Sequence, residues 1–447
     1  MGLFGSSGVR GIINVELTPE EIMELAAVAT ADWNAERVAI AQDTRLPSEA
    51  CANAASSGAA SAGTDIDRVG VIPTPGLQRY LAQMEIPGIM VTASHNPPSY
   101  AGLKLFDAEG IELGGERLER IERSLGKNQN PAVSWHEFGR ERQIDTAIDQ
   151  YLSNLRELVD VQAIESADVT VAIDPGHGAA CRTTGRFFSD MGCRVVTVND
   201  TIDGRFPGRQ PEPIPSALAD LCDLTRASDA ILGVAHDGDG DRAVFVDETG
   251  SVVSGDTILA ILAAELVSPD DVVVSAVNAS DRLANAVSAN GGTLVRTPIG
   301  SVHIVSKTKS LLSEGTTVPL AGEGNGGLFL PMHGLFRDAL LVTTVIASLV
   351  LDEPLSKRAE KFDGYHLVRE EVPYEGTDES MRLMDRVAEF AAEESLSVDR
   401  TDGIRMEYED GWTLVRQSGT EPVIRFVSEA SDEATATGRL DTLLSLS

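Results

Sequence analysis

Apolar positions in the first part of the chain alternate between short strand-like runs and helix-like spacing. Thr18-Pro19-Glu20-Glu21 is typical of a helix start, with Thr18 as the N-cap, proline in the first turn and Glu21 closing a capping box. Apolar residues at helical spacing give that helix one buried face: Ile22, Leu25, Ala26 and Ala29. Apolar runs predict strands at 38–40, 69–72 and 89–91, and the alanine-rich segment 47–63 is helical in character. This alternation predicts a largely parallel sheet covered by helices.

The same alternation returns twice. Strands are predicted at 169–173, 194–198 and 230–235, with a turn at 174–178 leading into a helix, and then at 272–277, 293–295 and 318–321. A polar loop at 126–131 and a helix near 144–159 separate the first two cycles, and 352–363 is predicted to be a linker. We expect three similar α/β domains (1–145, 146–250 and 251–360) and a C-terminal α+β domain (361–447).

The net charge and the apolar content disfavour a nucleic-acid-binding protein and a membrane protein. The formal net charge is −33, and a field of this sign repels nucleic acid and anionic membranes. No apolar run approaches the roughly 18 residues of a membrane span, and the first residues lack the features of a secretory signal, so we expect a cytoplasmic protein. An ordinary acidic enzyme is one interpretation of the charge. We favour adaptation to high salt, which screens self-repulsion.

The strongest local signal is Asp237-Gly238-Asp239-Gly240-Asp241-Arg242. Three carboxylates at alternating positions need a cation between them, and Mg²⁺ and Ca²⁺ prefer such oxygen ligands. An acidic surface turn is the plain alternative. An EF-hand loop does not fit, because Arg242 stands at the sixth position, where glycine is required. An arginine beside a metal suits a phosphate that both contact.

The segment Thr92–Pro98 follows the predicted strand 89–91. Ser94 therefore lies at the C-terminal end of a strand, where open α/β sheets place reacting groups. Such a serine can be a turn residue, a nucleophile or a phosphate carrier. His95 can perform acid–base work or only orient the loop, and Lys104 can stabilise a transferring group or shuttle a proton.

Arg416–Pro422, followed by Arg425, offers backbone N–H groups, hydroxyls and two guanidinium groups. This chemistry suits a phosphate dianion, with a polar turn as the alternative. The loop Gly322–Gly327 carries Glu323 and Asn325, which can hydrogen-bond sugar hydroxyls if the loop is more than a glycine-rich connector.

Two further residues, Arg296 and His303, are candidate substrate contacts. The glycines of Gly322–Gly327 fit a dinucleotide fingerprint only loosely, and the acidic partner about 20 residues on is lacking, which disfavours a nicotinamide site.

Together these motifs resemble those of the α-D-phosphohexomutase superfamily. The likeness spans the chain in the family's order, over Phe4–Gly11, Thr92–Pro98, Asp237–Arg242, Gly322–Gly327 and Arg416–Pro422. It implies a heart-shaped α/β enzyme with a central cleft, in which three α/β domains with mixed, mostly parallel sheets precede a mobile α+β domain. Asn325 and Gly327 replace a serine and a histidine that many members carry, which is similar to archaeal phosphoglucosamine mutases and phosphomannomutases. Gln417 stands where proline is more usual.

The resemblance also implies roles for individual residues. Ser94 would be carried as phosphoserine, and Mg²⁺ would be held by that phosphate with Asp237, Asp239 and Asp241. The reacting phosphoryl group would be surrounded by Arg10, His95, Lys104 and Arg242. The sugar would be read by Glu323 and Asn325. The non-reacting phosphate would be held by Arg416, Ser418, Gly419, Thr420 and Arg425.

These inferences combine into one hypothesis: a phosphohexomutase that interconverts hexose 6-phosphate and 1-phosphate through a phosphoserine and a 1,6-bisphosphate intermediate. Mg²⁺ and a hexose 1,6-bisphosphate primer would be required. Among hexose phosphates we expect glucosamine phosphate to be the substrate, and mannose and glucose phosphates are the alternatives. A metal-dependent phosphatase and a non-enzymatic phosphosugar or calcium sensor are the competing classes. We expect a monomer or homodimer with no nucleic-acid or membrane partner.

Overall fold

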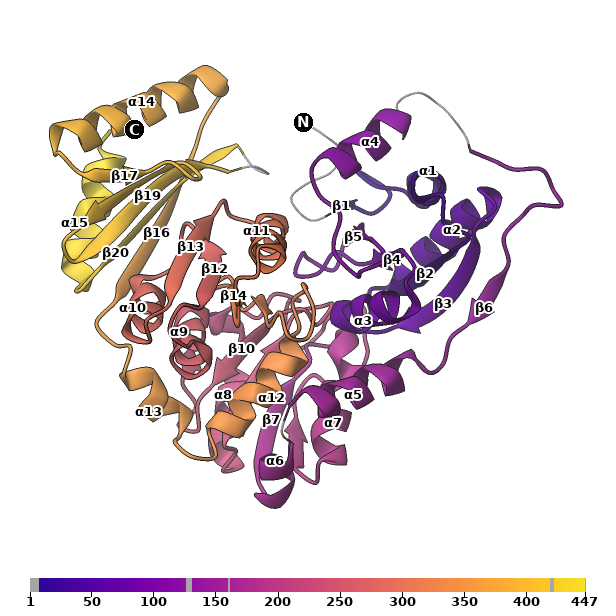
Figure 1. The fold of residues 1–447 in the computed structure, drawn as a ribbon, viewed down its shortest axis with the longest axis horizontal. Helices are drawn as coiled ribbons and strands as arrows, with labels where there is room; N and C mark the ends of the chain where they lie inside the picture. The colour runs from indigo at the N-terminus through magenta and orange to yellow at the C-terminus, as the bar shows by residue number, and fades with distance from the viewer. Residues whose placement is uncertain (1–7, 126–130, 160, 419–421, 447) are drawn as a thin grey trace. The chain divides into compact units, whose positions relative to one another are not determined.

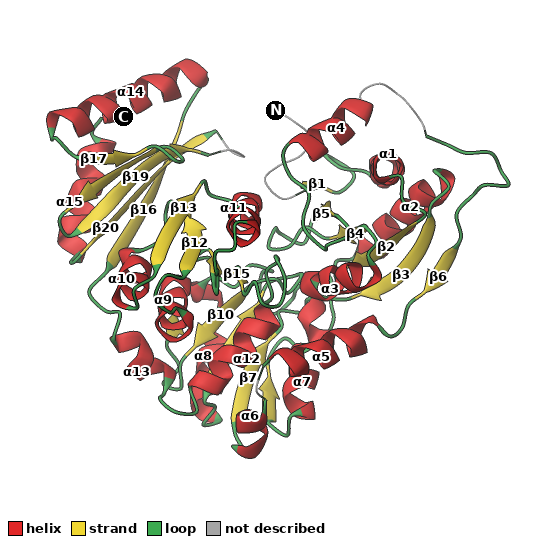
Figure 2. Ribbon diagram, viewed as in Figure 1, coloured by secondary structure: helices red, strands yellow, loops and turns green. Residues whose placement is uncertain are grey.

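The computed structural model of the chain describes residues 8–125, 131–159, 161–418 and 422–446 (Figure 1). The fold consists of α/β domains with mixed sheets, followed by a C-terminal domain built on an antiparallel sheet (Figure 2). The chain divides into two compact units. The first runs to Gly255 and adds Asn325–Arg358, and the second combines Asp256–Gly324 with the chain from Ala359 onward.

The first sheet has the strand order β1-β5-β4-β2-β3-β6. Its strands are β1 (Val9–Ile12), β2 (Arg37–Gln42), β3 (Asp65–Val71), β4 (Gly88–Val91), β5 (Tyr100–Phe106) and β6 (Glu141–Gln143). Strands β4, β2, β3 and β6 are parallel, whereas β5 runs antiparallel to both β4 and β1. The expected strand at 69–72 was placed too late, because the first part of β3 contains the charged residues Asp65, Asp67 and Arg68. Asp67 is nevertheless fully buried in β3, where Arg142 pairs with it.

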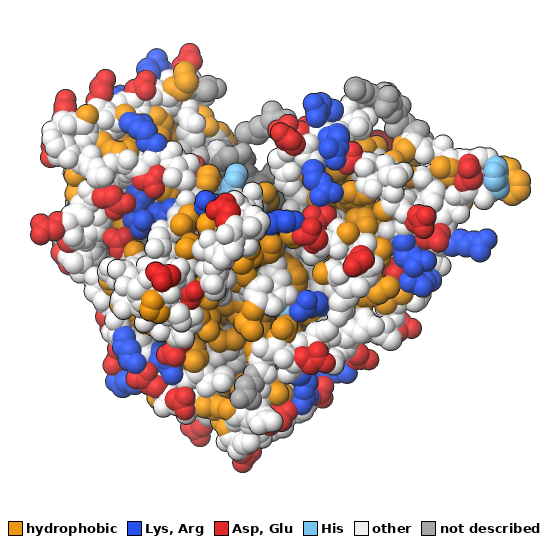
Figure 3. Space-filling view, in the orientation of Figure 1, with side chains coloured by type: hydrophobic (Ala, Val, Ile, Leu, Met, Phe, Trp, Pro, Cys, Tyr) orange, Lys and Arg blue, Asp and Glu red, His pale blue; other side chains and the backbone are white. Residues whose placement is uncertain are grey.

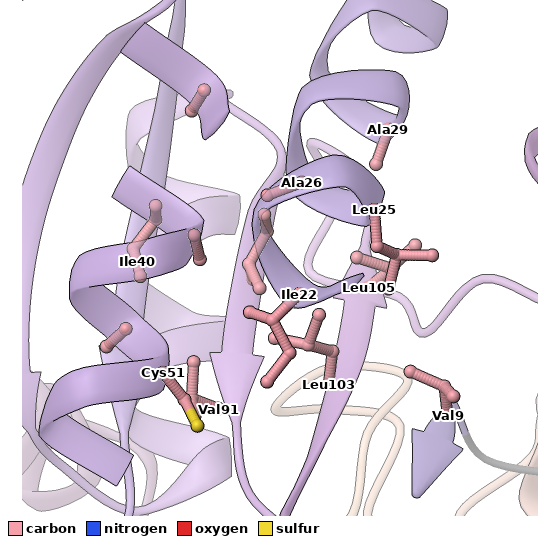
Figure 4. Packing of buried hydrophobic residues seen from close by; sticks show 14 of the residues in the cluster. Val9, Ile22, Leu25, Ala26, Ala29, Ile40, Cys51, Val91, Leu103 and Leu105 are labelled. Atoms are coloured by element: carbon pink, nitrogen blue, oxygen red, sulfur yellow. The ribbon is translucent and has the colours of Figure 1, made fainter. Parts of the chain in front are cut away.

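Helices cover both faces of this sheet: α1 (Pro19–Trp33), α2 (Ser48–Ser61), α3 (Thr74–Met84), α4 (Glu116–Leu125) and α5 (Ala147–Leu158). The predicted capping box of Thr18 and Glu21 is present at the start of α1. Helices α1 and α2 pack closely, since a Cβ atom on Gly58 would lie 2.1 Å from the Met23 carbonyl oxygen. The predicted apolar face of α1 lies in the core beneath them (Figure 4).

The second sheet has the order β11-β10-β9-β7-β8. Its strands are β7 (Thr170–Asp174), β8 (Arg194–Thr197), β9 (Leu232–His236), β10 (Ala243–Val246) and β11 (Val252–Val253), and its helices are α6 (Gln162–Ser166), η1 (Ala179–Arg182), α7 (Thr184–Asp190), η2 (Pro215–Ala217) and α8 (Ala219–Ala227). As in the first sheet, a parallel pair (β7 and β9) is followed by an antiparallel strand (β10). The loop between β4 and β5 and the loop between β9 and β10 therefore occupy the same place in the two topologies.

The third α/β segment contributes α9 (Gly255–Leu266), β12 (Val272–Ala276), α10 (Asp281–Ala289), β13 (Thr293–Thr297), α11 (Ser301–Ser313), β14 (Ala321–Gly322), β15 (Leu328–Phe329), α12 (Ala339–Leu349) and α13 (Leu355–Glu360). Strand β12 pairs in parallel with β13 and β14. The predicted strand at 318–321 is reduced to the short β14.

The predicted linker at 352–363 was wrong, because it contains helix α13. Its sequence is polar, but Leu355 and Arg358 are buried, and the Arg358 guanidinium donates to the Leu349 carbonyl at 2.9 Å. Tertiary contacts of this kind order a segment that composition alone marks as a connector.

The C-terminal sheet has the order β16-β20-β19-β18-β17, and its neighbouring strands are antiparallel. Its elements are β16 (His366–Pro373), α14 (Thr377–Glu393), β17 (Ser397–Asp399), β18 (Ile404–Tyr408), β19 (Gly411–Gln417), β20 (Val423–Ala430) and α15 (Glu433–Leu444). Arg405 is fully buried, stacks 4.1 Å from the centre of the Trp412 ring and donates to the Val277 carbonyl. This arginine joins the C-terminal domain to the third α/β segment within one compact unit.

Acidic side chains are spread over the visible face of the molecule and are interspersed with lysine and arginine side chains (Figure 3). Among the described residues, no helix combines the length and apolarity that crossing a bilayer requires.

Candidate active site

Ser94 occupies the loop that connects β4 to β5 and is fully buried. Its backbone has φ = 50°, the left-handed region that costs a non-glycine residue about 1 kcal/mol or more. The loop holds this shape because the Ser94 N–H donates to Thr92 Oγ1 at 2.8 Å. In this conformation the Ser94 hydroxyl donates to Asp237 Oδ2, also at 2.8 Å.

The three aspartates lie in the loop between β9 and β10 and converge as the sequence predicts. One oxygen from each of Asp237, Asp239 and Asp241 lies within 4.8 Å of the others, and all three residues are buried. Gly238 allows this loop to approach the serine loop, since a Cβ atom there would lie 2.6 Å from the Ser94 carbonyl oxygen. Two loops separated by more than 140 residues thus form one cluster.

Lys104 projects from β5 into the aspartate cluster. Its ammonium group is buried and lies 2.7 Å from Asp239 Oδ2 and 3.0 Å from Asp241 Oδ2. Burial alone would lower the pKa of Lys104, but the two carboxylates outweigh burial and raise the pKa above its ordinary value. Lys104 is therefore a fixed cation within the aspartate cluster to which the Ser94 hydroxyl also donates.

The donor set of the aspartate loop fits a divalent cation. Burial and the neighbouring carboxylates raise the pKa of Asp237 well above its ordinary value, so one Lys104 does not balance three carboxylates. Oδ1 of Asp239 and Oδ1 of Asp241 are buried, and neither has a hydrogen-bond partner among the described residues. Hard oxygen ligands with unused lone pairs are the ligands that Mg²⁺ prefers.

Two arginines and a histidine border the same cluster. Arg10, on β1, donates to Asn96 Oδ1 at 2.9 Å and so contacts the serine loop. The Arg242 guanidinium Nε lies 3.9 Å from Asp241 Oδ1, and its backbone N–H donates to Asp237 Oδ1 at 3.2 Å.

The His95 ring nitrogen Nδ1 lies 3.4 Å from Ser94 Oγ. Burial and the charges of Arg242 and Arg10 lower the pKa of His95 to about 3, so the imidazole is neutral. A neutral ring can accept a proton or a hydrogen bond here, and both roles considered for His95 stay open.

Asn325 belongs to the same compact unit as this cluster. Its side chain accepts from the Gly327 N–H at 3.0 Å, and the next residue, Gly326, accepts from the Ala243 N–H at 3.2 Å. The Asn325 turn is therefore packed beside Arg242, the residue before Ala243.

A second group of predicted residues lies in the other compact unit. Glu323 directly follows β14, is buried and accepts from the Gly300 N–H at 3.2 Å. The preceding N–H, from Ile299, donates to Asp402 Oδ2 at 3.0 Å, and the same oxygen lies 3.3 Å from Arg416 Nε. The backbone of Ile299 and Gly300, together with Asp402, thus connects Glu323, which is predicted to bind the sugar, to Arg416, which is predicted to bind the phosphate.

Arg416 and Arg425 face each other on neighbouring antiparallel strands β19 and β20. Directly opposite residues share a face of the sheet, so two cations stand side by side, an arrangement that is destabilising without an anion. Glu371 on β16 offsets one of them, 2.8 Å from Arg425 Nε. Ser418 is buried and ends this stretch. Gly419 and Thr420 lie outside the described residues.

Arg296 and His303 belong to the second group only loosely. Arg296, on β13, lies 3.6 Å from Asp281, and His303 is exposed in the first turn of α11. The His303 N–H donates to the Gly300 carbonyl at 3.1 Å, and Gly300 is the residue whose own N–H donates to Glu323.

Four family descriptions match consecutive parts of the chain: Phosphoglucomutase/phosphomannomutase alpha/beta/alpha domain I over residues 1–132, domain II over 149–250, domain III over 254–365, and the C-terminal domain over 376–444. The chain belongs to the phosphoglucomutase/phosphomannomutase family. It is a member of the α-D-phosphohexomutase superfamily and an isomerase that transfers phosphoryl groups within hexose phosphates.

Relatives of this phosphohexomutase match it over almost their whole length. A "Probable phosphoglucosamine mutase" of Methanopyrus kandleri is 36% identical over 97% of this chain and 95% of its own. A "Phosphoglucomutase/phosphomannomutase" of Thermococcus kodakarensis is 35% identical over 97% and 96%. A solved structure of a "Phosphoglucomutase/phosphomannomutase family protein" from Burkholderia thailandensis is 26% identical, covers 99% of this chain and 96% of its own, and gives a TM-score of 0.86.

The sequence analysis missed one residue that contacts the aspartate loop of the candidate active site. Thr74, at the start of α3, donates its hydroxyl to Asp239 Oδ2 at 2.6 Å and its N–H to the Asp239 carbonyl at 2.8 Å. The helix N-terminus also favours a negative charge at this carboxylate. The signal in the sequence was Thr74-Pro75 after a predicted strand, the same strand-end position that singled out Ser94.

Proposed function

We propose that Ser94 carries the phosphoryl group of this phosphohexomutase. The observation that carries the proposal is the 2.8 Å hydrogen bond from the Ser94 hydroxyl to Asp237, in a buried cluster that also contains Lys104. Phosphoryl transfer needs an in-line nucleophile and fixed charges around the phosphoryl oxygens. A serine held in a left-handed conformation beside carboxylates and cations meets both requirements.

In the proposed cycle, phospho-Ser94 gives its phosphoryl group to the free hydroxyl of a hexose monophosphate. The bond from phosphorus to Ser94 Oγ breaks and a bond to the sugar oxygen forms, while the sugar hydroxyl loses a proton and the departing Ser94 Oγ gains one, which restores the serine hydroxyl. The hexose 1,6-bisphosphate then presents its other phosphate, which returns to Ser94 Oγ and leaves the isomeric monophosphate. A trace of bisphosphate primes an enzyme that lacks the phosphate.

The residues of the chain divide this work. Lys104 and Arg242 supply positive charge at the transferring group, and Arg10 orients the serine loop through Asn96. Asp237, Asp239 and Asp241 would hold Mg²⁺, which when bound neutralises charge on the phosphoryl oxygens.

Binding of the non-reacting phosphate is assigned to the second group. Arg416 and Arg425 form a side-by-side pair of cations, which suits a dianion. Glu323 would accept hydrogen bonds from sugar hydroxyls, and Asn325 would do the same from its own turn. Gly419 and Thr420 complete the proposed phosphate loop from the sequence alone.

Glucosamine 6-phosphate and glucosamine 1-phosphate are the substrates we propose first. The Methanopyrus kandleri relative named a probable phosphoglucosamine mutase supports this choice. Mannose and glucose phosphates are the alternative, supported by the name of the Thermococcus kodakarensis relative.

The test compares the wild-type enzyme with Ser94→Ala and with Ser99→Ala, an exposed serine on the same loop. Each is incubated with Mg²⁺, a trace of hexose 1,6-bisphosphate and one of three hexose 1-phosphates, and ³¹P NMR follows isomer and free phosphate. Mass spectrometry of the peptide that carries Ser94 reports its phosphorylation.

We expect isomer formation and a phosphorylated Ser94 in the wild type and in Ser99→Ala, and neither in Ser94→Ala. Mutase activity in Ser94→Ala would contradict the role of the serine. Free phosphate without isomer would instead identify a phosphatase. Fastest turnover of mannose or glucose 1-phosphate would overturn only the choice of sugar.

A further inference from the structure

A buried ion pair lies directly beneath the serine loop. Asp43 follows β2, the parallel neighbour of β4, and Arg45 pairs with it through Nε at 3.0 Å. Both side chains are fully buried. Because neither charge reaches solvent, the remaining donors of the guanidinium must be used inside the protein.

Arg45 uses those donors on the backbone of the serine loop. Nη2 donates to the carbonyl oxygens of Ser94 and Asn96, each at 2.6 Å, and Nη1 donates to the carbonyl of Pro97 at 2.6 Å. Asp43 completes the arrangement by accepting from Thr92, the residue whose hydroxyl also accepts from the Ser94 N–H. One ion pair therefore fixes both the N–H and the carbonyl of Ser94.

A second buried aspartate–arginine pair, whose arginine also donates to backbone carbonyls, lies next to the aspartate loop in the second domain. Asp174 ends β7, the parallel neighbour of β9, and Arg209 Nε lies 2.8 Å from its carboxylate. Arg209 Nη2 donates to the carbonyl of His236 at 2.6 Å. His236 is the last residue of β9 and immediately precedes Asp237, so the guanidinium holds the start of the aspartate loop.

The segment 201–211 contacts both ion pairs, Asp43–Arg45 and Asp174–Arg209. Its Phe206 ring lies 5.5 Å from the Arg45 guanidinium, and three residues later Arg209 reaches the aspartate loop. Gly204 lies so close to the Arg45 backbone that a Cβ atom there would be 2.6 Å from the Arg45 carbonyl carbon. Arg45, which supports the serine loop, is thus packed directly against the segment 201–211, whose Arg209 supports the aspartate loop.

We propose that Arg45 and Arg209 are a matched pair of positioning residues, in which Arg45 fixes the attack geometry of Ser94 and Arg209 fixes the metal-binding geometry of Asp237. The inference rests on the proposed function of Ser94. Lysine at either position keeps the positive charge but lacks the planar fork that serves several carbonyls at once. Arg→Lys variants therefore separate geometry from charge.

Two measurements on the full-length enzyme distinguish these roles. The first is the rate at which hexose 1,6-bisphosphate phosphorylates Ser94, followed by quenching and mass spectrometry at saturating metal. The second is the affinity for Mn²⁺ without sugar, measured by electron paramagnetic resonance. Arg205→Lys is the matched control, since Arg205 lies in the same segment with a side chain that is 71% exposed.

For Arg45→Lys we expect a rate of Ser94 phosphorylation about 10- to 100-fold lower, since a misplacement near 1 Å costs about 100-fold. Its Mn²⁺ affinity should fall less than that of Arg209→Lys, because the Arg45 guanidinium donates to the backbone of the serine loop, whereas Arg209 donates to the residue that precedes Asp237. For Arg209→Lys we expect Mn²⁺ affinity about 10- to 100-fold weaker, as is typical when a group that supports metal ligands is lost. Arg205→Lys should change neither.

Equal changes in both measurements for both variants, in proportion to their loss of thermal stability, would overturn the proposal in favour of a general structural role. Unchanged values in both would overturn it as well. If Arg45→Lys does not fold, Phe206→Leu provides the test, because it removes only the ring over Arg45 and should slow Ser94 phosphorylation while leaving Mn²⁺ affinity unchanged. Activity in Ser94→Ala would refute the proposed function itself, whereas an inactive Ser94→Ala beside a normal Arg45→Lys refutes only this inference.

Discussion

The close approach of the aspartate loop to the serine loop allows a sharp test at Gly238. A Cβ atom at this position would lie 2.6 Å from the Ser94 carbonyl oxygen, and ordinary contact begins at 3.4 Å. Gly238→Ala must therefore separate the loops by about 0.8 Å, since neither contacting group is the end of a flexible side chain. The backbone of Gly238 is outside the left-handed region, so the effect is steric.

A separation of this size acts on both chemistry and stability. Because Ser94 Oγ and Asp237 are only a hydrogen bond apart, we expect kcat for sugar phosphate isomerisation to fall about 10- to 100-fold. Overpacking of a tight contact should lower the free energy of unfolding by about 1–3 kcal/mol. ³¹P NMR of the isomerisation and urea unfolding measure the two effects.

Gly185→Ala, in helix α7, is the control. Its Cβ atom would lie 3.9 Å from the nearest side-chain atom, an ordinary contact, so activity should be unchanged. Alanine within a helix should raise the free energy of unfolding by about 0.5–1 kcal/mol. A Gly238→Ala enzyme with the kcat of the wild type would refute the reasoning that the loops must stay in this register.

Three more predictions follow from other parts of the molecule. Thr74→Val should weaken Mn²⁺ binding about 10- to 100-fold, because it removes a hydrogen bond that orients Asp239; unchanged affinity would contradict this role. Burial raises the pKa of Asp67, but hydrogen bonds from Arg142 and Tyr80 outweigh burial and lower the pKa below its ordinary value. Asp67→Asn should therefore lower the free energy of unfolding at pH 7, and the gap between wild type and variant should shrink as the pH falls below about 4. A gap that grows in acid-unfolding curves would contradict this prediction. With a net charge of −33, the melting temperature should be higher in 2 M KCl than in 0.1 M KCl, and equal values would count against salt adaptation.

The functional loops were predictable because their signals are local. A short apolar strand followed by glycines, prolines or carboxylates marks the end of a sheet strand, and this pattern located Ser94 and the aspartate loop. The convergence of Asp237, Asp239 and Asp241 was predicted from their alternating positions and from the oxygen ligands that divalent cations prefer, and the structure brings their oxygens together.

The remaining features depend on contacts between residues that are distant in sequence. Arg45 and Ser94 are 49 positions apart, and Thr74 and Asp239 are 165 apart, so no sequence window contains either pair. Strand β1 was missed because its pairing partner, β5, lies 90 residues away. Helix α13 was missed because it is held by distant contacts, such as the hydrogen bond from the Ser356 N–H to Glu248, 108 positions earlier.

The left-handed backbone of Ser94 has a consequence for how the enzyme can be inactivated. Glycine adopts φ = 50° without strain, whereas alanine retains the full steric penalty of the β-carbon. Ser94→Gly should therefore abolish turnover and yet melt at a temperature no lower than Ser94→Ala, as thermal denaturation can show. The position that we propose as the phosphoryl carrier is thus one where serine costs the fold stability, so keeping a hydroxyl there opposes a more stable fold.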